Sequence, residues 1–257
     1  MNLFSIIQKR PSNRFLLALA GFVAGFQVTA QAPASLAVSL LGGSDRLTVA
    51  KTEGTLWSGV LVDARAGGVA LGDVSFSLRG LSLLTGAASA DVRLEGGAVF
   101  GSGRVRASFG GIEISDAQFD FDLATARRYM FLGAPLEGRL SGVVRELKLA
   151  PKGCAAADID LRTNVLAAPA RRFRGAPLDL AGGASCVNGA IIATLAGESV
   201  DGAVRLRLAV RPDMTYTLDA TAAPARAELA EALRVFGFTQ GEGAMSMAMS
   251  GAFRPGS

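Results

Sequence analysis

Side chains that alternate between apolar and polar with a period of two most restrict the fold of this chain. In one run, Val204, Leu206 and Leu208 alternate with Arg205 and Arg207. Successive side chains of a strand point to opposite faces, so such runs predict antiparallel strands with one apolar and one polar face. Glycine supplies 32 of the 257 residues, which suits many tight turns and disfavours helices. We expect a mainly β chain with about a dozen short strands. Similar runs begin at Val74, Val105, Phe119 and Met245.

Paired glycines and one proline–aspartate pair are the predicted turns of this sheet. Beyond the N-terminal segment, one stretch has a helical pattern, Pro224–Phe236, with Gly237 just after it. Its residues Leu229, Leu233 and Phe236 share one face, so we expect a short C-terminal helix that covers part of the apolar face. The predicted turns are Gly67-Gly68, Gly96-Gly97, Gly110-Gly111, Gly182-Gly183 and Pro212-Asp213.

Two parts of the chain resemble each other, which predicts a curved sheet with two similar halves. The matched segments lie 84 and 86 residues apart. We expect pseudo-repeats at about 51–134 and 135–253 that stack edge to edge, because no Pro/Ser-rich linker separates them. The matches are Glu53–Gly59 with Glu137–Gly142, and Val92–Ala98 with Leu178–Ala184.

The N-terminal segment predicts a membrane anchor. Residues 1–14 form a polar leader that contains three cations, and residues 15–32 carry no charge. Cations before an apolar run place the leader in the cytoplasm and residues 33–257 across the membrane. We favour an uncleaved transmembrane helix over a signal peptide cleaved after Ala30-Gln31-Ala32, and both interpretations export the body of the chain.

Charge and composition exclude several classes of function. Lys9, Arg10 and Arg14 carry three of the four net positive charges, which leaves +1 for the rest of the chain. The pI near 9.5 therefore does not predict a nucleic-acid partner. The sequence contains no histidine, which excludes an imidazole base and a His-ligated zinc. We expect a protein that is not an enzyme and has no cofactor.

Cys154 and Cys186 are the only cysteines of the chain. In an exported protein thiols oxidise, so we expect a structural disulfide between them. Two unrelated buried thiols are the alternative interpretation.

Two groups of polar residues are candidate sites. Asp116, Asp120 and Asp122, like Asp158 and Asp160, have the spacing of carboxylates on one face of a strand. Such carboxylates could bind a divalent ion, but we interpret them as a solvated strand face and expect no metal.

A basic segment with one aromatic residue lies between Pro169 and Pro177. We interpret it as a solvated loop, with a contact for lipid headgroups or an acidic partner as the alternative. The segment consists of Arg171, Arg172, Phe173 and Arg174.

Trp57 is the only tryptophan and lies in the box Gly54-Thr55-Leu56-Trp57-Ser58-Gly59. The glycines at each end of a four-residue strand are expected to leave the space that the indole ring fills. A contact with a partner is the alternative role of this ring.

With this box the chain resembles the type II secretion system protein N family. The resemblance implies a single-pass protein of the Gram-negative inner membrane with a periplasmic β domain, a disulfide pair between the halves and no catalytic residue. It also implies partners among other type II secretion components, which a sheet edge would bind by strand addition. The residues that carry it are the box, the anchor from Phe15, Leu47-Thr48-Val49, Val74–Leu78, Leu83–Gly86, and Leu229–Gly237 with the strand from Gly243 to Gly251.

A second function remains open. A curved, glycine-rich sheet with one apolar face is also similar to the AsmA-type envelope proteins, which implies lipid binding or lipid transfer. The apolar face would then be an open groove instead of being covered by side chains and the helix.

Overall fold

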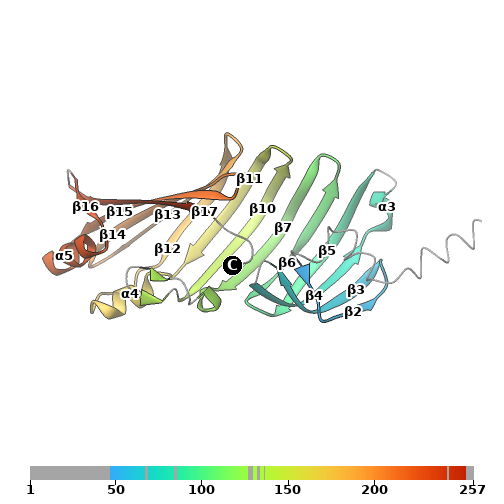
Figure 1. Cartoon of the computed structure of the whole chain (residues 1–257), viewed down its shortest axis with the longest axis horizontal. Coiled ribbons are helices and arrows are strands. Elements are labelled where there is room, and N and C mark those ends of the chain that lie inside the picture. Colours follow the sequence, from blue (N-terminus) through green and yellow to red (C-terminus); the bar gives the residue numbers. More distant parts are fainter. Residues whose placement is uncertain are drawn as a thin grey trace, which may run out of the picture.

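The computed structural model describes residues 47–66, 69–83, 86–126, 130–131, 134–135, 137–241 and 243–252. A 15-stranded antiparallel sheet contains all but one pair of the described strands (Figure 1). The prediction of a mainly β, antiparallel fold is therefore confirmed.

Most strands of the sheet have eight to twelve residues, as the bounds show. The helices are α3 (Gly80–Leu83), α4 (Ala167–Arg172), α5 (Ala227–Val235) and a 3-10 helix, η2 (Leu123–Ala126). The strands are β1 (Leu47–Thr48), β2 (Lys51–Gly54), β3 (Ser58–Ala66), β4 (Val69–Leu78), β5 (Ala87–Gly96), β6 (Val99–Ser108), β7 (Gly111–Asp122), β8 (Met130–Phe131), β9 (Ala134–Pro135), β10 (Arg139–Ala150), β11 (Gly153–Thr163), β12 (Leu180–Val187), β13 (Ala190–Ser199), β14 (Gly202–Val210), β15 (Thr215–Pro224), β16 (Thr239–Gln240) and β17 (Met245–Ala252).

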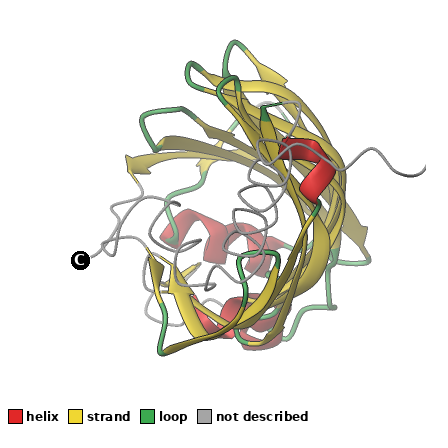
Figure 2. Cartoon of the chain, turned by 90° about the vertical axis from the view of Figure 1, so that its right-hand side faces the viewer, coloured by secondary structure: helices red, strands yellow, loops and turns green. Residues whose placement is uncertain are grey.

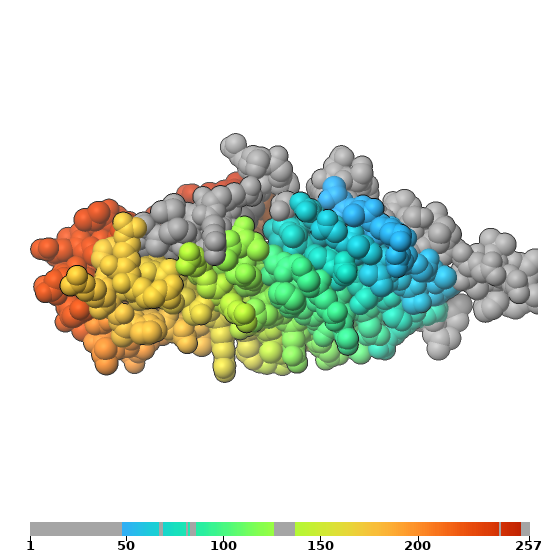
Figure 3. Space-filling model, turned by 90° about the horizontal axis from the view of Figure 1, so that it is seen from below, coloured from blue at the N-terminus to red at the C-terminus, as the bar shows by residue number. Residues whose placement is uncertain are grey.

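From β3 to β15, neighbouring strands of the sheet follow one another in the chain, except that β7 pairs with β10 because β8 and β9 form a separate sheet. At the two ends of the sheet, β1 and β2 both pair with β3, and β17 lies between β15 and β16. Figure 3 shows the consequence, because the colours of the sequence succeed one another along the length of the molecule. Figure 2 shows the strands on an arc, with helices on its inner side. Short connections of this kind need no crossover, so each strand finds its partner locally.

A row of directly opposed residues runs along the apolar face of the sheet from β3 to β17. In its middle part, glycine alternates with a large apolar residue from one strand to the next. A strand without a side chain at this point lets its neighbours approach closely, and the face can curve inward. In order, the row is Leu61, Val74, Leu94, Gly101, Phe119, Gly142, Leu161, Gly182, Leu195, Leu206, Ala220 and Met247.

Gly142 shows why this row needs glycine. A Cβ atom at this position would lie 2.6 Å from two ring carbons of Phe119, and 3.0 Å from the carbonyl oxygen of Asp160. The aromatic ring of Phe119 on β7 thus occupies the space above Gly142 on β10. Gly251 on β17 has the same role for Tyr216, whose hydroxyl would lie 2.7 Å from an added Cβ.

The predicted turns are only in part correct. The structure has turns at Gly96-Gly97, at Gly110-Gly111 and at Pro212-Asp213, whereas Gly67-Gly68 lies outside the described residues. Gly182-Gly183 is no turn, because both residues lie inside β12. A Cβ at Gly182 would lie 1.9 Å from the carbonyl oxygen of Thr194, so close strand packing explains this glycine.

The predicted C-terminal helix is present as α5, but it begins later than expected. Pro224 ends β15, and Gly237 follows the helix with φ of +89°. Leu233 of α5 packs on a core formed by Ala220, Ala222, Phe238 and Met245, so the helix covers the apolar face as predicted. The prediction of a single helix was wrong, because α3 and α4 are too short to produce a recognisable helical period.

The same order of elements occurs twice in the sheet. Two strands, a helix and three strands make up β3 to β7, and again β10 to β14. Gly54 and Gly138, which precede the two series, both have positive φ, +92° and +110°. The matched segments Val92–Ala98 and Leu178–Ala184 do not have the same structure, because Gly96 ends β5 at a turn while Gly182 lies within β12. Duplication of units near 51–134 and 135–253 stays a proposal.

Replacement of Gly142 by alanine is expected to lower the free energy of unfolding by about 1–3 kcal/mol, because the new methyl group collides with the Phe119 ring. Urea denaturation measures the change. Gly110→Ala is the matched control, since the nearest atom to its added Cβ is the Ser108 hydroxyl oxygen at 3.7 Å. Equal stability of the two variants would show that the Phe119 ring moves aside without cost.

Candidate functional site

Charged side chains on the polar face of the first half form a chain of ion pairs. Arg79 binds both carboxylate oxygens of Asp91, at 2.9 and 3.1 Å. Arg104 lies between Asp91 and Asp116, at 3.5 and 3.0 Å. Arg79 directly follows β4, and the other three residues stand on β5, β6 and β7, so the charges alternate in sign and Asp116 has a cationic partner in Arg104.

Arg145 neutralises the second predicted group of carboxylates. Its guanidinium lies 3.0 Å from Asp158 and 2.5 Å from Asp160, on the neighbouring strand β11. The hydrogen bond to Asp158 and the charges of both carboxylates raise the pKa of Arg145 above its ordinary value. Arginine is fully charged at ordinary pH, so this guanidinium always supplies the positive charge of the cluster.

The remaining two candidates also have partners. Asp120 lies 4.0 Å from Arg139, and the Asp122 carboxylate accepts the N–H of Ala124 at the start of η2. Within the described part of the chain, no group of three or more metal-binding side chains comes together. The aspartates thus form part of a polar strand face, where each has a cationic or N–H partner.

The tryptophan box forms the connection between β2 and β3, and the expectation of a strand there was wrong. The amide N–H of Thr55 donates to the carbonyl of Ser58 at 2.9 Å, which closes the turn. A Cβ at Gly54 would lie 2.5 Å from that same carbonyl oxygen, so the turn leaves no space for a side chain at this position. The indole of Trp57 lies instead over Gly80, where an added Cβ would be 3.4 Å from its ring.

An apolar cleft of about 130 Å³ lies between α4, α5 and strands of the second half. Val204, Leu206 and several alanines form its floor, and the small alanine side chains leave its space open. The rings of Phe173 and Phe236 meet edge to face at its border, with their centres 5.8 Å apart. At one end, Arg226 and Asp201 form an ion pair of 2.8 Å, and the Asp201 side chain is only 18% exposed.

The residues of the basic segment lie in different surroundings: its arginines are exposed, and its phenylalanine lines this cleft. Arg171 and Arg172 end α4 and are exposed, while Phe173 lines the cleft and Arg174 follows with φ of +53°. The interpretation as a plain loop was wrong for the first two residues, because Ala167–Arg172 is helical. Pro169 belongs to the first turn of that helix, where its missing N–H costs no hydrogen bond. The pairing of Phe173 with Phe236 has no signal in the sequence.

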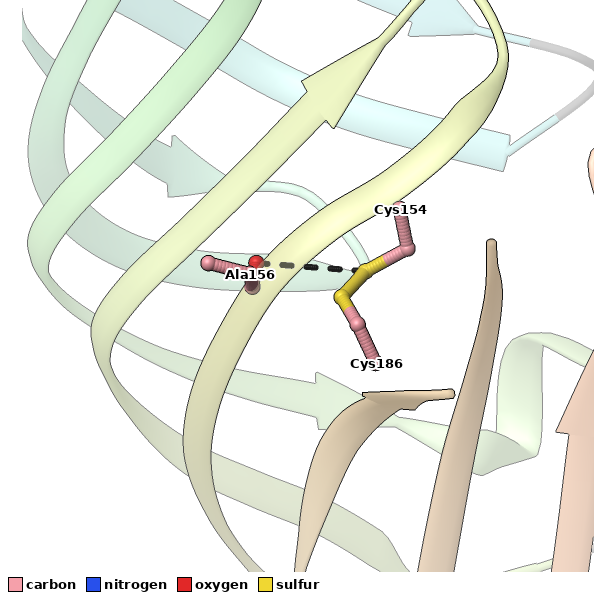
Figure 4. The surroundings of a disulfide bond; sticks show 3 residues. All are labelled: Cys154, Ala156 and Cys186. Carbon is pink, nitrogen blue, oxygen red and sulfur yellow. Dashed lines mark hydrogen bonds between the residues drawn. A yellow bond between two sulfur atoms is a disulfide. The ribbon is translucent and has the colours of Figure 1, made fainter. Parts of the chain in front are cut away.

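The two cysteines form a disulfide that joins β11 to β12 (Figure 4). Their Cα atoms are 5.6 Å apart, and the Cys154 sulfur lies 3.8 Å from the carbonyl oxygen of Ala156. Both cysteines belong to the second half, so the expectation of a disulfide between the halves was wrong. The bond spans the place where β11 and β12 are no longer paired, since their ladder ends at Ile159 and Ala184.

One border of the sheet is open over most of its length. β17 pairs with β15 along Met245–Ala252, but β16 covers only Met245 and Ser246 on its other side. At the opposite border, β1 and β2 both pair with β3. Met247–Ala252 therefore has no strand on its outer side within the described residues. The alternating methionines predict this strand, but only the topology reveals that it is an edge.

The comparisons with known proteins decide the family. The model of the family described as Type II secretion system (T2SS), protein N, matches residues 45–248. The chain belongs to this family. The Type II secretion system protein N of Vibrio cholerae serotype O1 (strain ATCC 39315 / El Tor Inaba N16961) is 30% identical over 136 residues. That stretch covers 51% of this chain and 54% of the relative, about half the length of each. No solved structure matches the chain.

The predicted anchor at residues 15–32 lies outside the described residues. Among the helices that the structure does describe, none is both long and apolar enough to cross a bilayer. The anchor thus stays a prediction from the sequence.

Replacement of both cysteines by serine is expected to lower the free energy of unfolding by about 3–4 kcal/mol. The bond closes a loop of 32 residues, and its loss frees the unfolded chain. Thermal or urea denaturation of the oxidised wild type and of the double variant measures the effect. A reductant should destabilise only the wild type, and equal stability of the oxidised wild type and the variant would contradict the structural role.

Proposed function

We propose that this protein is a non-catalytic scaffold of the type II secretion machinery, held in the inner membrane by residues 15–32 and folded in the periplasm. Family membership supports a role in type II secretion. The uncharged apolar run behind three cations supports the anchor, and the disulfide suits an oxidising compartment.

The open edge of β17 is the observation that carries the scaffold role. The N–H of Gly241 donates to the carbonyl of Ala244, which thus faces outward from the sheet. Because backbone groups alternate along an antiparallel strand, those of Ala248 and Ser250 also face outward. An extended segment of another secretion component would bind these groups by adding one more strand.

The side chains of this edge suit partners of more than one sequence. Met247 and Met249 stand on the apolar face, and Met249 is 43% exposed. Methionine is flexible and polarisable, so it adapts to different apolar side chains. Specificity would then come from the alternation of the added strand, apolar on the inner face and small on the outer face.

Ala248→Pro tests this role, because proline removes an outward N–H without removing a hydrogen bond to β15. We expect the variant to lose photo-cross-links from position 250 to other secretion components in cells, and to secrete less cargo. Ala248→Thr keeps the N–H and is the matched control. Unchanged cross-links and secretion in the folded Ala248→Pro protein would contradict strand addition at this edge.

Lipid binding is the second candidate function, and the apolar cleft is the observation that favours it. Its lining is apolar apart from Ser199 and Asp201, and exposed cations of α4 lie beside it. An acyl chain would occupy the space above the alanine floor, and a phosphate headgroup would approach the arginines.

Native mass spectrometry of gently purified protein tests the lipid function. We expect phospholipid to stay bound to the wild type and to be lost from Ala232→Phe, whose ring fills the cleft from α5. Val235→Phe on the same helix is the control, because Val235 is 82% exposed and does not line the cleft. A wild type without bound phospholipid would contradict this function.

A further inference from the structure

The edge of β17 carries none of the usual protection of an open sheet edge. Proteins blunt such edges with charges, prolines, bulges or a covering element, because open edges otherwise aggregate. The described strand Met245–Ala252 contains no charged residue and no proline, and its pairing with β15 runs without a bulge. β16 covers only two of its residues. Among the described residues, nothing else covers this edge.

The absence of charge indicates what kind of strand fits this edge. On the polar face, β17 presents Ser246, Ala248 and Ser250, although the adjacent β15 carries Asp219 on the same face. A strand that binds a foreign partner gains specificity from complementary charges. A strand without charge can pair with its own copy, because no like charges then stand opposite each other.

We propose that β17 pairs antiparallel with β17 of a second copy of this chain until a secretion partner replaces it. The inference uses the same open edge as the proposed function but names a different occupant. A two-fold axis perpendicular to the sheet makes this pairing antiparallel and keeps both apolar faces on one side. The methionines of the two copies then meet, which buries the exposed part of Met249.

The register of the pair follows from the alternation of side chains. Residues on the same face lie opposite each other only if the axis passes midway between one residue and the same residue of the second copy. Within the free segment Met247–Ala252, the central choices are Met249 and Ser250. Opposed Cα atoms at either position would be about 4.5–5.5 Å apart, which suits a disulfide between two identical residues.

The other border of the sheet is less suited to adding a strand. The border strands there are β1 and β2, which are short, and β2 carries the charged residues Lys51 and Glu53 that discourage edge-to-edge addition. Pairing of β17 with β17 uses the same edge of both copies, so it closes after two copies.

Single cysteines introduced into the full chain test the pairing. We expect Met249→Cys or Ser250→Cys to form a disulfide-linked dimer of twice 26.4 kDa in mild detergent under oxidising conditions. Val200→Cys is the control, because Val200 is 87% exposed but lies in the turn between β13 and β14. Dimer yields no higher than this control at both positions would overturn the proposal.

Charge substitutions give a second and independent test by light scattering. The double variant Ala248→Lys/Ser250→Lys should be a monomer, and its neutral counterpart with glutamine at both positions should stay a dimer. Co-expression of the lysine variant with the corresponding glutamate variant should restore the dimer. A lysine variant that remains dimeric would overturn pairing through β17.

The two proposals fail separately. A monomeric wild type that still cross-links to secretion components through position 250 overturns the self-pairing and leaves the scaffold role intact. A disulfide-linked dimer of the Met249→Cys or Ser250→Cys variant supports the self-pairing even if no cross-link to secretion components forms. In that case only strand addition by other components is lost.

Discussion

The backbone hydrogen-bond ladder of a single long antiparallel sheet holds this molecule together, and its thin core depends on it. Few large side chains are fully buried, and Leu180 and Met245 are the largest of them. Both lie where α4 and α5 cover the apolar face. Elsewhere the sheet has one apolar side and one charged side, so stability comes from strand pairing more than from a closed interior.

Curvature follows from the glycines of the central row. Gly101, Gly142 and Gly182 stand opposite Leu94, Phe119, Leu161 or Leu195, and each lets a neighbouring strand or ring approach. The inner face can then bend around the helices, while ion pairs on the outer face compensate the charges there. The disulfide between Cys154 and Cys186 holds β12 to β11 where their ladder stops.

A sheet of this kind has two borders and two faces, and the borders differ in a way that bears on function. One border consists of the short strands β1 and β2 and carries Lys51 and Glu53, whereas β17 is longer, open and uncharged. The membership of the type II secretion system protein N family gives this difference a meaning, because a component of a machine needs a place where other chains attach. The cleft beside Phe173 and Phe236 offers a separate place for an apolar ligand.

The sequence by itself determined the strands, the helix near Leu233, the absence of imidazole chemistry and the cysteine pair, because alternation, caps and redox chemistry are local or compositional signals. It misplaced Gly182-Gly183 as a turn, since a glycine that permits close strand packing looks the same as one that reverses the chain. It also missed the meeting of Phe173 with Phe236 and the open edge of Met247–Ala252. Only the tertiary structure decided these, because they depend on which strands become neighbours, and backbone groups left unpaired at a border have no signature in the residues that carry them.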